Sequence, residues 1–305
     1  MTAVILQILF SSLVTAGMWL YAPDASRTDL EALYAGPPSS FVEADGVRVH
    51  LRDTGKRDEP VIIMLHGFGA SLHTWEAWAQ VLSAEYRVIR FDLPGFGLTG
   101  ADPTGDYTDA RAEAVLAALM DRLRVQRAIL IGNSMGGRIA WSFAASHPAR
   151  VTRLVLISPD GFASAGIPYG QAMGVPMTAR LLPYVLPTPL LRANLAPAYG
   201  DPQRLTEEVL IRYRDMILAP GVRDAVLARM EQDALEDPVP VLRRLNLPVL
   251  LLWGEKDGII PISNAADYLA ALPDARLVAL PGLGHVPQEE SPAEALQPVK
   301  KFLAR

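Results

Sequence analysis

A serine, an aspartate and a histidine, each beside glycines, are the residues of this 305-residue chain best suited to chemistry. Ser134 lies in Gly132-Asn-Ser-Met-Gly136, Asp257 lies in Gly254-Glu-Lys-Asp-Gly258, and His285 ends a Gly-Leu-Gly-His turn. A serine hydroxyl becomes a nucleophile when a histidine takes its proton and a carboxylate orients that histidine. The three residues therefore suggest nucleophilic attack by the serine, with the histidine as base and the aspartate as its partner.

The neighbours of the Gly-x-Ser-x-Gly motif support this interpretation. The apolar run 128–131 precedes the motif and a helical pattern over 135–146 follows it, which is the strand–turn–helix order of a nucleophile elbow. In such a turn the serine side chain leaves the sheet. The next amide, that of Met135, lies at a helix N-terminus, where it can donate a hydrogen bond to an oxyanion.

A second oxyanion donor is expected in the loop after the apolar run 61–65, which reads His66-Gly-Phe-Gly69. We assign it to the Phe68 amide. His66 itself is interpreted as a structural residue whose ring hydrogen bonds fix the loop. The two glycines also match the beginning of a dinucleotide fingerprint, but Leu72 stands where its third glycine belongs, so no nucleotide cofactor is predicted.

Apolar runs and helical patterns alternate along the chain and must position these residues. Short runs that predict strands cover residues 47–51, 61–65, 88–91, 128–131, 154–157, 249–253 and 277–280. Helices are predicted over residues 109–123, 135–146, 207–218, 265–271 and 292–303. Strands that are apolar on both faces are typical of a parallel sheet covered by helices, so we predict a doubly wound α/β fold. The candidate acid and base then lie at carboxyl ends of strands, which is where active sites and ligand-binding sites of α/β sheets are found.

The alternation stops between residues 160 and 236, where prolines and amphipathic helical pieces replace strands. A structureless loop of that length is improbable in a compact domain. We therefore predict a helical cap over 160–236, inserted into a core formed by 40–159 and 237–305.

The N-terminus carries a separate signal. No residue from Thr2 to Ala22 is charged, and about 20 helical residues span roughly 30 Å of hydrocarbon. A signal peptide is the alternative, although no Lys or Arg precedes the apolar stretch and Pro23 follows the best cleavage candidate. We predict an anchor or signal segment over 1–22 and a linker over 23–39. The protein is then membrane-anchored by a single span, or exported or periplasmic if the segment is cleaved.

Composition excludes several classes of function. The chain has a net charge of −5 and no clustered basic run, so nucleic acid is not an expected partner. It has no cysteine, which excludes disulfides, thiolate catalysis and cysteine-ligated metals. No His-Glu-x-x-His or similar cluster predicts a metal site. The oligomeric state is not indicated.

Five motifs together resemble the α/β-hydrolase superfamily with a helical cap. They are His66-Gly-Phe-Gly69, Asp92-Leu-Pro-Gly-Phe-Gly97, Gly132-Asn-Ser-Met-Gly-Gly137, Trp253-Gly-Glu-Lys-Asp257 and Gly284-His285. The resemblance covers residues 40–305 and implies the α/β-hydrolase fold, a mostly parallel doubly wound sheet with a cap insertion. The chain order serine, aspartate, histidine is the one used by this fold. Some members carry the acid after the strand that ends near residue 157, so Asp160 stays an alternative, whereas Glu255 is expected to face solvent.

Within the superfamily, the N-terminal span, the elbow and the Pro-rich stretch 182–189 are similar to membrane-anchored monoacylglycerol lipases. That similarity implies a small-molecule ester substrate with a lipophilic acyl chain. The elbow also resembles that of meta-cleavage-product hydrolases, which break carbon–carbon bonds of dienoates with the same triad. The chain departs from them in its oxyanion loop and at Val286, where they commonly carry Trp. A tethered binding protein without catalysis is the third hypothesis, while Ser134 argues against the epoxide hydrolases and haloalkane dehalogenases, which need an Asp nucleophile.

Overall fold

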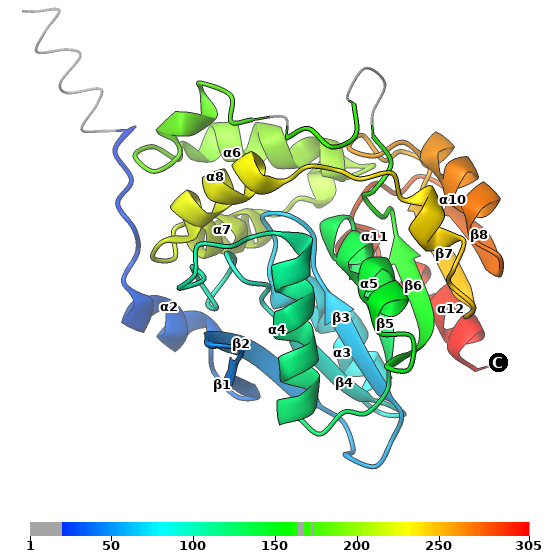
Figure 1. The fold of residues 1–305 in the computed structure, drawn as a ribbon. Coiled ribbons are helices and arrows are strands. Elements are labelled where there is room, and N and C mark those ends of the chain that lie inside the picture. Colours follow the sequence, from blue (N-terminus) through cyan, green and yellow to red (C-terminus); the bar gives the residue numbers. More distant parts are fainter. Residues whose placement is uncertain (1–19, 164–167, 173, 305) are drawn as a thin grey trace, which may run out of the picture.

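A computed structural model describes residues 20–163, 168–172 and 174–304. Within them, one eight-stranded sheet has the order β1-β2-β4-β3-β5-β6-β7-β8 (Figure 1). The strands are β1 (Ser39–Ala44), β2 (Val47–Thr54), β3 (Val61–Leu65), β4 (Arg87–Phe91), β5 (Ala128–Asn133), β6 (Val151–Ile157), β7 (Val249–Gly254) and β8 (Ala275–Leu280). The pairs β1–β2 and β2–β4 are antiparallel and the other neighbours are parallel. The predicted mostly parallel sheet is thus confirmed.

Helices cover both faces of this sheet, because successive side chains of a strand point to opposite faces. The main covering helices are α3 (Glu76–Leu82), α4 (Asp109–Arg122), α5 (Met135–Ser146) and α12 (Pro292–Leu303). On one face α4 and α5 pack over Leu65 and Leu130. On the other face α3 and α12 pack over Met64 and Ile131. These alternating contacts explain why the strands read as continuous apolar runs.

Shorter helices surround the ends of the strands. They are η1 (Leu72–Trp75), α9 (Val239–Leu242), η5 (Ile262–Asn264), α10 (Ala265–Ala271) and α11 (Pro287–Glu290). Leu242 of α9 is fully buried in the same core as α4 and α5. The chain has therefore returned to the core by residue 242.

Between β6 and α9 the described residues form helices and connecting loops and no strand of the sheet. The elements are η2 (Ala179–Leu181), α6 (Thr188–Leu195), η3 (Ala196–Ala198), η4 (Pro202–Arg204), α7 (Glu207–Ile217) and α8 (Val222–Gln232). The helices lie over one end of the sheet, as the yellow-green ribbons of Figure 1 show. Leu186, Leu191, Leu210 and Leu218 belong to a third, smaller apolar core, which also includes Ala22 and Val286. We call this region the cap.

The segment predicted as a linker, residues 23–39, is more ordered than a tether, which corrects that expectation. It contains helix α2 (Arg27–Tyr34), whose N-cap Ser26 accepts a hydrogen bond from the Asp29 amide. Leu30 is buried in the core, and only this residue of the helix is buried. A helix of two turns with a single buried side chain has too weak an apolar period to be recognised in the sequence.

The predicted anchor or signal segment, residues 1–22, lies almost wholly outside the described residues. Among residues 20–163, 168–172 and 174–304, no helix is long and apolar enough to cross a bilayer. Where the described chain begins, it already lies on the cap: the Ala22 amide donates to Tyr184 O at 2.8 Å and the Ala25 amide to Leu218 O at 2.8 Å.

Candidate active site

Ser134 occupies the tight turn between β5 and α5. Its backbone has φ 53° and ψ −122°, a conformation that non-glycine residues rarely adopt. The turn is held because the Ser134 amide donates to Ile157 O at 3.0 Å, while the Ser134 carbonyl accepts the amides of Gly137 and Arg138. Ser134 remains partly exposed although its neighbours on both sides are buried. A strained, accessible serine between a strand and a helix is the geometry of a nucleophile elbow.

The glycines of the motif are required by close backbone approach. An ideal Cβ placed on Gly136 would lie 2.3 Å from the Leu65 carbonyl oxygen. One placed on Gly132 would lie 2.3 Å from the Gly136 carbonyl oxygen. Any side chain at either position must therefore push β5, α5 or β3 apart.

The loop after β3 lies directly against the elbow. An ideal Cβ on Gly67 would lie 3.2 Å from the Ser134 Cβ. Within the described part of the chain, neither the Phe68 amide nor the Met135 amide donates to a protein acceptor. Both predicted oxyanion donors are thus available to donate a hydrogen bond to a ligand. Met135 is the first residue of α5, where the helix dipole favours negative charge.

His66 fixes the same loop and is fully buried. Its Nδ1 lies 2.8 Å from Gly67 O, which can only accept, and its Nε2 accepts the Leu93 amide at 3.0 Å. These partners select the neutral ring with the proton on Nδ1. Burial is the main cause that lowers the pKa of His66, so the ring stays neutral and serves the structural role inferred from the sequence.

The structure brings His285 and Asp257 together. Asp257 follows β7, His285 follows β8, and His285 Nδ1 lies 2.8 Å from Asp257 Oδ2. The other carboxylate oxygen, Oδ1, accepts the amides of Ile259 at 2.9 Å and Ile260 at 2.8 Å. Both side chains of the pair are buried. The carboxylate therefore orients the imidazole through Nδ1, and Nε2 has no protein hydrogen-bond partner among the described residues.

Among the described residues, the elbow meets the histidine loop through a neighbour of the serine rather than through a Ser134 hydrogen bond. Asn133 Nδ2 donates to His285 O at 2.9 Å. Gln288 Nε2 in turn donates to Asn133 Oδ1 at 3.2 Å. Sequence reasoning missed both residues as parts of the site, although Asn133 stands inside the motif.

Asp160 does not contact the histidine. Its carboxylate pairs with Arg138 Nη1 at 3.1 Å, and its amide donates to Ser134 O at 3.1 Å. Burial is the main cause that raises the pKa of Asp160, although the charge of Arg138 opposes it. Glu255 is exposed, as expected. Asp257 is thus the carboxylate in position to orient His285.

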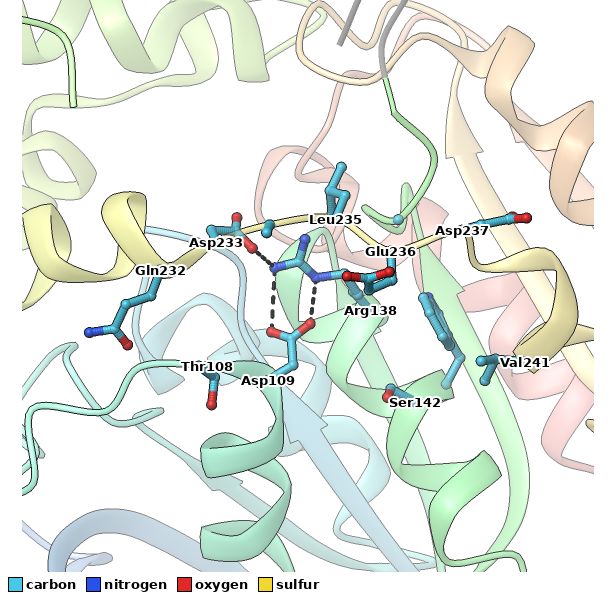
Figure 2. A pocket seen from close by; sticks show the side chains of 13 residues that line it. Thr108, Asp109, Arg138, Ser142, Gln232, Asp233, Leu235, Glu236, Asp237 and Val241 are labelled. Carbon is cyan, nitrogen blue, oxygen red and sulfur yellow. Dashed lines mark hydrogen bonds and ion pairs between the residues drawn. The ribbon is translucent and has the colours of Figure 1, made fainter. Parts of the chain in front are cut away.

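Arg138 is the centre of a charged cluster where the cap rejoins the core. Its buried guanidinium pairs with Asp109 at the start of α4, with Asp160 after β6, and with Asp233 at the end of α8. Figure 2 shows Asp109 and Asp233 converging on Arg138 beside a pocket of about 270 Å³. Arg229 of α8 also pairs with Asp109. All these carboxylates have protein partners, so the cluster joins the cap to the helix that follows the elbow.

The described residues contain no group of three or more His, Cys, Asp or Glu side chains arranged to hold a metal ion.

Comparison with known proteins gives the same fold and several activities. Residues 60–292 match the family described as alpha/beta hydrolase fold. The chain is 31% identical over 289 residues to the dihydrolipoyllysine-residue acetyltransferase component of the acetoin cleaving system of Cupriavidus necator, covering 92% of this chain and 72% of the relative. It is 30% identical over 269 residues to a 2-hydroxy-6-oxononadienedioate/2-hydroxy-6-oxononatrienedioate hydrolase of Pseudomonas sp., covering 84% and 92%. The crystal structure of a membrane phospholipase A, a bacterial virulence factor, matches with a TM-score of 0.75 and 27% identity, covering 100% of this chain and 98% of that one.

Proposed function

The chain belongs to the α/β-hydrolase family, and from that premise we propose that it is a serine hydrolase that cleaves carboxylic esters with a lipophilic acyl chain. The observation that carries the proposal is the strained, accessible Ser134 at the start of α5, on a sheet edge that also carries the hydrogen-bonded pair of His285 and Asp257. A nucleophile, a base and an orienting acid are the parts that acyl transfer needs.

In the first half of the reaction, Ser134 Oγ attacks the ester carbonyl while His285 Nε2 takes its proton. Asp257 keeps the Nδ1 proton directed toward itself and stabilises the imidazolium. The tetrahedral oxyanion accepts hydrogen bonds from the Phe68 and Met135 amides, each worth about 3 kcal/mol in comparable sites. The alcohol then leaves with the proton from His285, and Ser134 holds the acyl group.

In the second half, His285 takes a proton from water as the water attacks the acyl-enzyme carbonyl. The carboxylic acid leaves, and the proton returns to Ser134 Oγ. Every group therefore ends in its initial state, and the chain's own residues supply all the proton transfers.

The preference for a lipophilic acyl chain is supported by the Leu-, Val-, Ala- and Met-rich composition of the cap and by the match over the whole chain to a membrane phospholipase A. The competing reaction is hydrolysis of a carbon–carbon bond in a dienoate, because a relative of similar identity carries that activity. The chain's Gly67-Phe-Gly-Ala-Ser71 loop and Val286 favour the ester.

The test compares the full chain with Ser134→Ala on a monoacylglycerol, a series of aryl esters of graded acyl length, and a dienoate. We expect turnover of the longer esters and a loss of at least about 10⁴-fold in the variant, because alanine has no hydroxyl group to attack the carbonyl. A fluorophosphonate probe should label the wild type and not the variant. Preference for the dienoate would replace the ester proposal by the carbon–carbon one. Failure of the probe to label the wild type would favour a non-catalytic binding protein.

We also propose that residues 1–22 attach the protein to a membrane by a single N-terminal span. The stretch has no charged residue, and the chain enters the described region beside exposed apolar side chains of the cap. Tyr21, Leu181 and Tyr184 are 58%, 56% and 60% exposed there.

This attachment is tested on the full chain expressed in a bacterium. We expect it in the membrane fraction after an alkaline carbonate wash, with its N-terminus intact. A mature N-terminus near residue 23 would instead identify an exported or periplasmic protein, and release by the wash would exclude the span.

A further inference from the structure

A short stretch of the cap, residues 197–201, lies against the loops that carry the candidate acid and base, and we call it the cap clamp. It contacts the acid loop through Gly258, whose amide donates to the Pro197 carbonyl at 3.2 Å. It contacts the histidine loop through Ala198, whose carbonyl accepts the His285 amide at 2.7 Å. One piece of cap backbone thus contacts both loops, whose side chains Asp257 and His285 must stay hydrogen-bonded to each other.

Glycines allow this backbone contact. An ideal Cβ on Gly200 would lie 2.3 Å from the Gly282 carbonyl oxygen. One on Gly284 would lie 2.5 Å from the Ala198 carbonyl oxygen. The cap clamp and the histidine loop therefore pack main chain against main chain, with no side chain between them to absorb a shift.

A buried carboxylate completes the contact. Glu290 of α11 is only 6% exposed, and its side chain accepts three backbone amides. These come from Gly284 at 2.7 Å, Gly200 at 3.1 Å and Asp201 at 2.9 Å. One donor precedes the candidate base in the chain and two belong to the cap clamp. A buried charge without such donors would be costly, so the three amides and the carboxylate stabilise one another.

We propose that Glu290 is a positioning residue that, with the cap clamp, holds His285 at Asp257, so that the cap is part of the framework of the acid–base pair. The proposal rests on the proposed function, since it assigns a role in the same reaction. Glu290 contacts neither the imidazole nor the carboxylate of the pair; it acts through the Gly284 amide and the cap clamp.

The energetic reason is that proton transfer depends steeply on geometry. A misplacement of about 1 Å in a reacting group lowers rates by about 100-fold. The amide of Gly284 lies one residue before the base. Loss of its bond to Glu290 would release the backbone directly before His285, while the His285 amide stays bonded to Ala198 O. Glu290 is only 6% exposed and its carboxylate is bonded to backbone amides, so we expect kcat to change and KM not to change.

The experiment measures Glu290→Gln in the full chain with a short aryl ester, well below its melting temperature. Gln keeps the size of the side chain but replaces one accepting oxygen by a donating amide. We expect kcat to fall by about 10- to 100-fold with KM within twofold of the wild type. The far-downfield proton resonance of a His285 Nδ1–H bonded to Asp257 should broaden or shift in the same variant.

The matched control is Asp233→Asn, which weakens the junction of cap and core at Arg138 instead of the cap clamp (Figure 2). It is expected to lower the melting temperature while kcat stays within twofold and the proton resonance is retained. If Glu290→Gln does not fold, Glu290→Asp, which keeps the charge on a shorter side chain, replaces it and should lower kcat by about 3- to 30-fold.

An unchanged kcat together with an unchanged resonance in a folded Glu290 variant overturns the positioning role, even if the variant is less stable. An equal loss of kcat in Asp233→Asn would also overturn it, because any loosening of the cap would then suffice. If the wild type hydrolyses no ester, the proposed function fails separately, and the His285 resonance still reports whether Glu290 holds the pair.

Discussion

The serine and the base of the site are held by different parts of the molecule. The Ser134 backbone is bonded to the sheet, to α5 and to the residues directly after β6, because its amide donates to Ile157 and its carbonyl accepts the amides of the first turn of α5 and of Asp160. His285 is fixed by the core and the cap together, because its amide donates to Ala198. Ester hydrolysis by the proposed mechanism requires both, so its serine depends on contacts with the sheet and α5, whereas its base depends also on a contact with the cap.

This difference separates two effects of mutation. A change in the elbow should disturb folding and activity together, because β3, β5 and α5 approach one another there through glycines. A change in the cap clamp should disturb the acid–base pair while the sheet stays folded, because the two apolar cores on the sheet faces contain no residue of the clamp. The following predictions test this separation, beginning with the largest effect.

Replacing the acid tests the base half directly. Asp257→Asn should lower kcat for an aryl ester by about 10⁴-fold, because an amide stabilises the wrong imidazole tautomer and no imidazolium. Asp160→Asn, at the alternative position, should leave kcat within tenfold, since Asp160 pairs with Arg138. Steady-state kinetics of both variants measure this. If Asp160→Asn lost more activity than Asp257→Asn, Asp160 would be the catalytic acid. The proposed difference between how the serine and the base are held would then be wrong.

Two glycine substitutions compare the elbow with the cap clamp at positions where an added Cβ would be equally close to a carbonyl oxygen. An ideal Cβ meets a carbonyl oxygen at 2.3 Å both in Gly136 and in Gly200. Gly136→Ala should destabilise the whole chain by about 3 kcal/mol or prevent folding, because the sheet and α5 cannot separate. Gly200→Ala should keep a cooperative unfolding transition but lose most activity, because the cap clamp can move away from the histidine loop. Urea unfolding and kcat measure the two outcomes, and similar stability losses in both would contradict the separation.

The sequence predicted most of the core correctly. Strands β3, β5 and β7 and helices α5, α10 and α12 match their predicted ranges to within two residues, because their apolar patterns are continuous and their ends carry glycine or proline. Ser134, Asp257 and His285 were placed at the ends of β5, β7 and β8 for the same reason. The prediction that His66 is structural agrees with its two ring hydrogen bonds.

The elements and contacts that could not be predicted from the sequence depend on tertiary structure. Helix α2 buries one side chain, and strand β1 at the sheet edge is half-exposed, so neither has a strong period. The contact of Gly200 with Gly282 joins segments about 80 residues apart, and backbone contacts carry no side-chain pattern. Glu290, in an ordinary Gln-Glu-Glu run, is recognisable only once the amides around it are known.

The smallest predicted effect is a dependence of stability on pH that originates at one buried histidine, His73. His73 follows the oxyanion loop, and its ring is buried between Ser71 and the Tyr34 carbonyl. Burial is the main cause that lowers the pKa of His73 to about 4. Because the unfolded chain binds the proton near pH 6.5, the unfolded state holds more protons between pH 6.5 and about 4, and stability must fall as the pH falls through that window.

From pH 7 to pH 5 the loss due to this one residue should be about 1–2 kcal/mol. Urea midpoints of the wild type and of His73→Gln at the two pH values measure it, since Gln can keep the donor to the Tyr34 carbonyl and cannot take up a proton. The variant should lose less stability on acidification by about that amount. An identical decrease in both proteins would show that His73 is not the cause, and would assign the effect to other buried groups such as His66, whose pKa burial also lowers.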